Sequence, residues 1–213
     1  MTLDASPAVD RAARANPFRV SRVLRLRYRL GTVQWRDLLA RLAALDYRGA
    51  LVGPKGSGKT TLLEDLEQRL TAEGWRIVPL RLSAERSRLS AGDWRQLAGL
   101  RARDLVTVDG VEQLGAWSWR RLAWRCHGAG GLVVTSHSAG RLPTLRQHHT
   151  DPGLLLELVA ELVGPIPATR LRPRLEALFE RHHGNLRDCL RSLYDAWAAG
   201  ELEGLASCAP AAA

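Results

Sequence analysis

The sequence predicts an α/β fold, in which a parallel sheet is flanked by helices and followed by a small C-terminal helical lid. Three observations support this fold class. Short apolar segments alternate with amphipathic ones over residues 31–150, and parallel strands need such crossover connections. A glycine-rich loop directly follows the first apolar segment. Beyond residue 151 only helical periods remain, which indicates an all-helical second part.

The first half of the core begins with a helix and a buried strand. Apolar residues recur at helical spacing from Trp35 to Leu42, so we expect a helix over about 32–46. The apolar segment 49–52 is typical of a buried strand. A leucine stripe after residue 60 predicts an amphipathic helix. The next strand contains Pro79, which favours a sheet edge or a strand end.

The later segments continue this alternation of strands and helices before the helical lid. The predicted strands and helices of the core and lid are 75–82, 93–100, 104–109, 115–127, 131–136, 142–149, 152–163, 171–183 and 185–198.

The chain divides into four predicted segments. We expect an N-terminal arm over 1–30, the α/β core over 31–150, the helical lid over 151–204 and a disordered tail over 205–213. The two ends are rich in alanine and lack a steady apolar period, which is typical of loosely ordered termini.

Composition narrows the function classes. With 46% hydrophobic and 25% charged residues, the chain has the composition of a soluble globular protein. No apolar run approaches the roughly 18 residues of a membrane span, and the first residues lack the apolar centre of a secretory signal. The three cysteines, Cys126, Cys189 and Cys208, follow no pattern, so we expect a reducing cytoplasm.

The formal net charge of +9 is the sign that attracts nucleic acid. This charge is weaker evidence than usual for a nucleic-acid partner, because Lys55 and Lys59 are the only lysines among the 31 lysine and arginine residues. Codon bias alone produces such usage. The net charge alone therefore does not decide whether the chain contacts nucleic acid.

Residues 53–60 read Gly-Pro-Lys-Gly-Ser-Gly-Lys-Thr and match the complete phosphate-binding pattern G-x-x-x-x-G-K-[ST]. In this pattern backbone N–H groups surround the phosphates, the lysine meets the β/γ oxygens and the hydroxyl binds Mg²⁺. The preceding strand and the following helix supply the required context, because the positive end of that helix faces the anion. The sequence therefore predicts a nucleoside triphosphate with Mg²⁺ as cofactors. The predicted cofactor-binding residues are Gly53, Pro54, Lys55, Gly56, Ser57, Gly58, Lys59, Thr60, Thr61 and Ser136.

ATP is the expected nucleotide, since the sequence contains no guanine-reading N-K-x-D segment. The apolar strand 105–109 ends in Asp109, where P-loop ATPases place the aspartate near Mg²⁺. Thr60 and Asp109 are therefore the predicted metal-binding residues. Gly110 occupies the place where many ATPases have a catalytic glutamate, and the nearest following carboxylate is Glu112.

The run Asp109-Gly110-Val111-Glu112 resembles the acidic strand of STAND and NACHT-type relatives of the AAA+ ATPases. This resemblance extends over roughly residues 45–200 and implies that Glu112 orients the attacking water. The alternative is that Glu112 caps the next helix and hydrolysis is slow. Segment 132–137 resembles the strand that senses the γ-phosphate, which implies that Thr135 or Ser136 reports on it. His137 stands where STAND proteins often have an arginine.

Gly184-Asn185-Leu186-Arg187 resembles the sensor 2 segment of an AAA+ helical lid. The resemblance implies that Arg187 contacts the γ-phosphate and couples the nucleotide to the lid. Lys59, Glu112 and Arg187 are thus the predicted catalytic residues. Arginine fingers act between subunits in such families, and Arg141 and Arg146 follow the sensor strand as candidates.

Three functions remain open. The first is an ATPase that controls a protein partner by hydrolysis or lid closure, with an ATP-dependent oligomer as one form. The second is a nucleotide-gated binding module with little turnover, which Gly110 motivates. The third is a small-molecule kinase in which arginines clamp phosphate groups. The arginines of that third function are Arg81, Arg86, Arg88 and Arg95.

The predicted helix 115–127 has a second aromatic face. Trp117 and Trp124 are seven residues apart and share this face with Arg120 and Arg121. Either another part of the chain covers the two tryptophans, or they form a partner or single-strand surface in which aromatic stacking combines with arginine.

Overall fold

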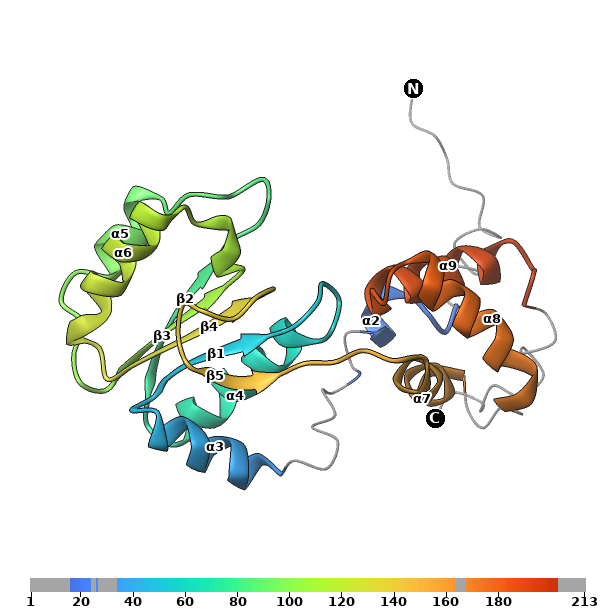
Figure 1. Cartoon of the computed structure of the whole chain (residues 1–213), viewed down its shortest axis with the longest axis horizontal. Helices are drawn as coiled ribbons and strands as arrows, with labels where there is room; N and C mark the ends of the chain where they lie inside the picture. The colour runs from blue at the N-terminus through green and yellow to red at the C-terminus, as the bar shows by residue number, and fades with distance from the viewer. Residues whose placement is uncertain (1–15, 24–25, 27–33, 164–167, 203–213) are drawn as a thin grey trace. The chain divides into compact units, whose positions relative to one another are not determined.

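The computed structural model describes residues 16–23, 26, 34–163 and 168–202. Two compact units make up the chain (Figure 1). The α/β unit lies within Tyr28–His149, and the helical unit is formed by the described residues of Met1–Arg27 and Thr150–Ala213.

One parallel sheet of five strands, in the order β2-β3-β4-β1-β5, is the base of the α/β unit. Every neighbouring pair is parallel, which confirms the predicted fold class. Pro79 lies in the edge strand β2, as expected, because a residue without an N–H disrupts least at an edge. The strands are β1 (Arg48–Val52), β2 (Arg76–Arg81), β3 (Asp104–Asp109), β4 (Gly131–Ser136) and β5 (Thr144–Gln147).

Helices cover both faces of this sheet (Figure 1). From β1 the chain crosses β4 and β3 to reach β2. It then returns to β3 and β4 one strand at a time, and it passes β1 to reach β5. Since such crossovers are right-handed, the outward and the returning connections place their helices on opposite faces. The helices of this unit are α3 (Trp35–Ala44), α4 (Lys59–Ala72), α5 (Ala91–Gln96) and α6 (Ala116–Arg125).

Two buried clusters show which helices pack on which face. Leu51 and Val133 point to the face covered by α3 and α4. Val52 and Val134, one residue further along the same strands, pack with residues of α5 and α6. This alternation follows from the two-residue period of a strand. The sheet is therefore buried on both sides, which explains its apolar strand sequences.

The strand order determines where the polar strand ends meet. Because β4 lies between β1 and β3, and parallel strands end at the same edge of the sheet, the residues after β1, β3 and β4 converge there. The backbone N–H of Gly53 donates to the carbonyl oxygen of Ser136 at 3.1 Å. The glycine-rich loop and Asp109 thus lie on either side of the end of β4.

Among the described residues, the helical unit has four helices with a core of their own. These helices are α2 (Val20–Val23), α7 (Pro152–Val163), α8 (Ala168–Arg181) and α9 (Leu186–Ala198). Phe18 is buried in this core, and the Asn16 side chain donates to the carbonyl oxygen of Tyr194 at 3.0 Å.

Asn16 and Phe18, which lie within the predicted arm 1–30, pack into the helical unit. The beginning of that arm and the tail predicted over 205–213 lie outside the described residues. Within the described part of the chain, none of the helices combines the length and the hydropathy that crossing a membrane requires.

Candidate functional site

The loop between β1 and α4 needs glycine at three of its positions. Gly56 and Gly58 have φ values of 76° and 83°, in the left-handed region that other residues rarely adopt. A Cβ on Gly53 would lie 2.6 Å from the Cβ of His148 and 2.8 Å from its carbonyl oxygen. The glycines of the pattern thus follow from backbone conformation and from close packing against His148.

Lys59 is the first residue of α4 and is 7% exposed. Its ammonium group donates to the carbonyl oxygens of Gly53 and Pro54, both at 2.7 Å. The loop therefore curls around the lysine that its pattern requires. Within the same loop, the buried Ser57 hydroxyl has no hydrogen-bond partner among the described residues. A buried hydroxyl without a partner is costly, so this atom fits a site that receives a polar ligand.

Asp109 is held between two threonine hydroxyls at the end of β3. Thr60 Oγ1 lies 3.0 Å from Asp109 Oδ2 and 3.2 Å from Oδ1. On the other side, Thr135 Oγ1 donates to Asp109 Oδ1 at 2.6 Å and accepts from the Gly110 N–H at 2.8 Å. A carboxylate next to a hydroxyl offers the hard oxygen ligands that Mg²⁺ prefers. The donor set thus fits the expected cation.

The residue after Asp109 has a steric reason to be glycine. Gly110 has a φ of 80°, and a Cβ there would lie 2.8 Å from the carbonyl oxygen of Leu82. A glutamate at this position would therefore be strained and would clash with the backbone. The short 3-10 helix η1 (Val111–Gln113) follows, and it carries Glu112 instead.

Glu112 lies beside the residue that follows β4. Its Oε1 is 3.1 Å from His137 Nε2, and its Oε2 is buried without a hydrogen-bond partner in the described part of the chain. η1 follows β3 and His137 follows β4, so this contact joins the ends of two neighbouring strands. The structure thus places the predicted catalytic acid at the same sheet edge as Asp109, with one of its oxygens in contact with a histidine.

Arg141 is the other basic group near this acid. Its guanidinium donates to the carbonyl oxygen of Leu114 at 2.6 Å and lies 5.3 Å from the ring centre of Trp119. Burial lowers the pKa of Arg141, and the negative charge of Glu112 partly opposes this. Arg141 is a predicted candidate for an arginine finger that acts between subunits. Its guanidinium is therefore held by contacts within its own chain.

The two hydroxyls at the end of β4 have different partners. Thr135 contacts Asp109, as described above. Ser136 Oγ accepts from the Ser138 N–H at 3.3 Å, while the Ser136 carbonyl accepts from the Gly53 N–H. Ser136 thus lies against the loop, and Thr135 orients the carboxylate.

Two arginines of the kinase hypothesis are engaged by carboxylates of the same unit. Arg81 Nη2 contacts both carboxylate oxygens of Glu67 at 2.8 and 2.9 Å, and Arg86 forms a salt bridge with Asp93. Thr107 also donates to Glu67 Oε1, at 2.6 Å. The contacts of Glu67 tie β2 and β3 to α4, and the Arg86 salt bridge ties a loop to α5. They remove support from a phosphate-clamping role.

His148 is a site residue that sequence reasoning did not identify. It is buried, and its Nδ1 lies 3.1 Å from the Ser57 carbonyl oxygen. Burial lowers its pKa to about 4, although the hydrogen bond to Ser57 acts in the opposite direction. The sequence offered no signal for this role, because His148 only appears as half of an adjacent pair. Among the described residues, His, Cys, Asp and Glu side chains form no cluster of three that suits a metal ion.

Arg187 belongs to the helical unit, whereas the other predicted site residues belong to the α/β unit. It is exposed on the first turn of α9. Its neighbours have local roles. Gly184, with a φ of 77°, lies in the turn after α8 and donates its N–H to the Phe179 carbonyl oxygen at 2.9 Å. The side chain of Asn185 accepts from the Asp188 N–H as the cap of α9. The Gly-Asn pair is thus accounted for by a helix stop and a helix start.

Neither a protein-family model nor a curated protein matches the sequence. Among solved structures, two mutant forms of Thermotoga maritima RuvB match with TM-scores of 0.52 and 0.51, each at 16% identity. Both alignments cover 79% of this chain and 65% of that protein's chain, so the chain spans less than two thirds of RuvB. At this identity the likeness shows the fold alone, which is an α/β P-loop fold with a parallel sheet flanked by helices.

Proposed function

We propose that this chain binds ATP with Mg²⁺ at residues 53–60 and hydrolyses it, as an AAA+/STAND-like module that controls a partner. The contact between Thr60 and Asp109 carries the proposal. It joins the hydroxyl of the loop to the carboxylate of β3 across the end of β4, next to a loop that encloses Lys59. At this sheet edge a phosphate-binding loop lies beside a hydroxyl and a carboxylate that suit a hard cation. This combination matches what a nucleotide with Mg²⁺ needs.

Each residue has a distinct part in this proposal. Lys59 neutralises charge on the β- and γ-phosphates, and the backbone N–H groups of the loop surround them. Thr60 and Asp109 hold Mg²⁺, which supplies electrostatic stabilisation of the transferred phosphoryl group when bound. Thr135 orients the Asp109 carboxylate through its 2.6 Å hydrogen bond. The Ser57 hydroxyl, which has no hydrogen-bond partner among the described residues, donates to the ligand.

Glu112 is the proposed group that orients the attacking water. It follows the glycine that cannot carry a side chain, and its Oε2 has no hydrogen-bond partner among the described residues. The other oxygen contacts His137. This contact favours a second candidate function, a nucleotide-gated binding module with little turnover, because a carboxylate held by a histidine is less available to water.

The helical unit is the proposed responder to the nucleotide. Arg187 is exposed and carries a charge that pairs well with phosphate, so we propose that it couples the γ-phosphate to this unit and to a protein partner. An ATP-dependent oligomer in the cytoplasm is the form in which we expect this control.

The test compares ATP binding with phosphate release in the full chain. Calorimetry with Mg²⁺ is expected to show binding for the wild type and a loss of at least tenfold in affinity for Lys59→Ala, since a charged contact contributes about 1.5–3 kcal/mol. Glu112→Gln is expected to bind ATP normally while phosphate release falls about 100-fold or more. Arg36→Ala and Glu64→Gln, on exposed helix positions, are the matched controls.

The outcomes separate the two candidate functions. If the wild type binds ATP but shows no phosphate release that depends on Glu112, the result contradicts the hydrolase and supports the nucleotide-gated module. Absence of ATP binding by the wild type contradicts both. Size-exclusion chromatography with mass measurement, with and without ATP and Mg²⁺, then tests the proposed ATP-dependent oligomer.

A further inference from the structure

Helix α6 presents an aromatic and basic stripe on its outer side. Trp117, Arg120, Arg121 and Trp124 follow the spacing i, i+3, i+4, i+7, which places them along one side of the helix. The side chains of Trp117 and Trp124 are 83% and 68% exposed. Leu122, on the inner side, is completely buried. The helix is thus anchored by one side, while the opposite side, called here the Trp/Arg face, is open.

The exposure of these two indoles is unusual for this chain. Among the described residues, the large hydrophobic side chains with high exposure are Val20, Trp117 and Trp124, so two of them lie on a single short helix. Exposed apolar groups that gather in one place mark interaction sites, whereas scattered ones need no explanation. Trp117 and Trp124 are therefore the strongest indication of a contact surface in the α/β unit.

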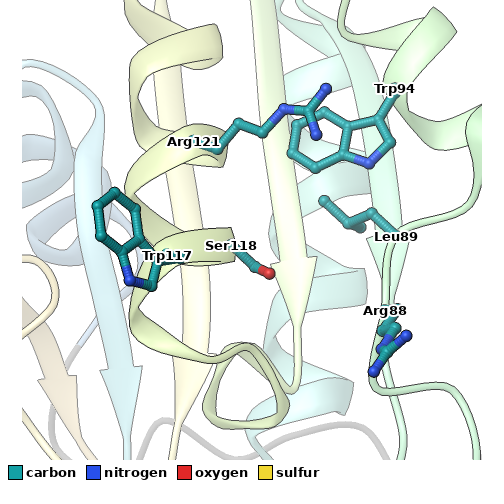
Figure 2. A pocket seen from close by; sticks show the side chains of 6 residues that line it. All are labelled: Arg88, Leu89, Trp94, Trp117, Ser118 and Arg121. Atoms are coloured by element: carbon teal, nitrogen blue, oxygen red, sulfur yellow. The ribbon is translucent and has the colours of Figure 1, made fainter.

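A shallow pocket of about 350 Å³ lies at one end of this face (Figure 2). The side chains that line it are Arg88, Leu89, Trp94, Trp117, Ser118 and Arg121. The guanidinium of Arg121 lies over the ring of Trp94, with Cζ 4.3 Å from the ring centre. Figure 2 shows Trp117 on the other side of Ser118 from this stacked pair. The pocket thus has an aromatic surface at one side and a planar cation at the other.

The charge on this face has one sign. Helix α6 contains Arg120, Arg121 and Arg125 and has no acidic residue between its ends. Neither Arg88 nor Arg120 forms a salt bridge with another described residue. The net charge of the whole chain, +9, has the same sign. A partner for this face therefore carries negative charge near flat apolar groups.

We propose that the Trp/Arg face of α6 binds a single-stranded nucleic acid, a role separate from the proposed ATP site. Bases stack on Trp117 and Trp124, because every base has a flat face and such stacking tolerates sequence. Arg88 and Arg120 pair with phosphate oxygens through the guanidinium fork. The uniform positive charge favours this polyanion over a protein surface, whose rim carries both signs.

The spacing of the two indoles suits a strand that runs along the helix. Seven residues of α-helix span about 10 Å, which corresponds to about three steps of 3.4 Å between stacked bases. A strand of about four nucleotides therefore reaches both tryptophans. Shorter oligonucleotides engage a single indole and bind correspondingly more weakly.

The experiment measures binding of a fluorescein-labelled oligothymidylate of about 20 nucleotides to the full chain by fluorescence anisotropy, without ATP. The Trp117→Ala/Trp124→Ala double variant is expected to lose at least tenfold in affinity, since stacking contributes strongly for each base. Trp117→Phe/Trp124→Phe, which keeps a flat ring at both positions, is expected to recover most of it. Val20→Ala, an exposed apolar residue of the other unit, is the matched control and binds like the wild type.

The arginines are tested through salt. For a single strand the logarithm of the binding constant falls with the logarithm of salt concentration by about 0.7 for each phosphate contact. Arg120→Ala is therefore expected to reduce this slope by about 0.7. Arg36→Ala, an exposed arginine of α3 on the other face of the sheet, is expected to leave the slope unchanged.

Three results overturn the proposal. The first is a wild type that does not bind the oligonucleotide, and the second is an alanine double variant that binds it as tightly as the wild type. The third is a wild-type dimer that the double variant converts to a monomer without any oligonucleotide binding, which shows that a second copy covers the face. Thermal unfolding of both double variants checks that the fold is intact. If the alanine pair unfolds, the change in salt slope of Arg120→Ala decides in its place.

Discussion

Thr60 and Asp109 are 49 positions apart in the sequence, yet Thr60 Oγ1 lies 3.0 Å from Asp109 Oδ2. The contact spans the end of β4, which lies between the two strands that carry the loop and the carboxylate. It brings a hydroxyl and a carboxylate into the pairing that a hard cation needs. The first prediction concerns this pair.

Thr60→Val keeps the shape of the side chain and removes the hydroxyl. We expect the Mg²⁺-dependent part of ATP affinity to fall about 10-fold to 100-fold, as for a hydrogen bond to a charged group of about 1.5–3 kcal/mol. Titration calorimetry with Mg²⁺ and with EDTA measures this part directly. Thr60→Ser retains the hydroxyl and is expected to keep it; equal losses in the valine and serine variants contradict the role of the hydroxyl.

Gly110→Ala tests the steric reason why the acid stands at position 112 and not directly after Asp109. Gly110 and Gly99 share a φ of +80°, but a Cβ at 110 lies 2.8 Å from the Leu82 carbonyl oxygen, whereas at 99 nothing lies within 4 Å. Gly99→Ala is therefore the matched control for backbone strain, with an expected cost of about 1–2 kcal/mol. We expect Gly110→Ala to lower the free energy of unfolding by about 2–4 kcal/mol, since overpacking adds to the strain. Urea unfolding measures both, and equal losses mean that the contact with Leu82 is not limiting.

His137→Ala removes the contact partner of Glu112 Oε1. If that contact restrains the acid, as we propose, phosphate release that depends on Glu112 rises several-fold, because both carboxylate oxygens become available to water. His127→Ala, an exposed histidine of the same unit, is the control with unchanged release. A lower rate in His137→Ala shows instead that the histidine orients the acid.

His148 makes stability depend on pH. Burial lowers its pKa from the ordinary histidine value of 6.5 to about 4, so the unfolded chain binds more protons than the folded chain between these values. The contribution of neutral His148 to the free energy of unfolding is therefore fully present above pH 6.5. It falls as the pH drops toward 4, with a slope of up to about 1.4 kcal/mol per pH unit. Denaturant unfolding from pH 7 to pH 4 measures this slope.

The His148→Gln variant provides the comparison for that pH series. This variant is expected to lose less unfolding free energy than the wild type between pH 6.5 and 4. His149→Gln, at the exposed neighbouring position, is expected to keep the pH dependence of the wild type. If His148→Gln loses as much stability between pH 6.5 and 4 as the wild type, another group is responsible.

Much of the fold follows from local patterns. The alternation of apolar and amphipathic segments predicts the parallel sheet. Pro79 favours a sheet edge or a strand end because it lacks the N–H that a central strand needs, and it lies in the edge strand β2. The glycines of the loop could likewise be identified, since their conformations are local.

Tertiary context accounts for what the sequence could not show. Thr135 and Ser136 are adjacent hydroxyls with the same local pattern, and only the neighbouring strands decide that Thr135 contacts Asp109 while Ser136 contacts the loop. Phe18 lies in a segment without a regular period, and its burial depends on helices more than a hundred residues away in the sequence. The roles of the loop and Asp109 as ATP and Mg²⁺ ligands remain predictions.

The position of β4 between β1 and β3 has a thermodynamic consequence. A ligand that engages both Thr60 and Asp109 recognises only the state in which three neighbouring strands are paired in register. Its binding free energy therefore adds to the free energy needed to separate the central strands. The ligand thus protects the amides of β4 against hydrogen exchange, although β4 need not contact the ligand. At a hundredfold excess over the dissociation constant, this linkage amounts to about 2.7 kcal/mol.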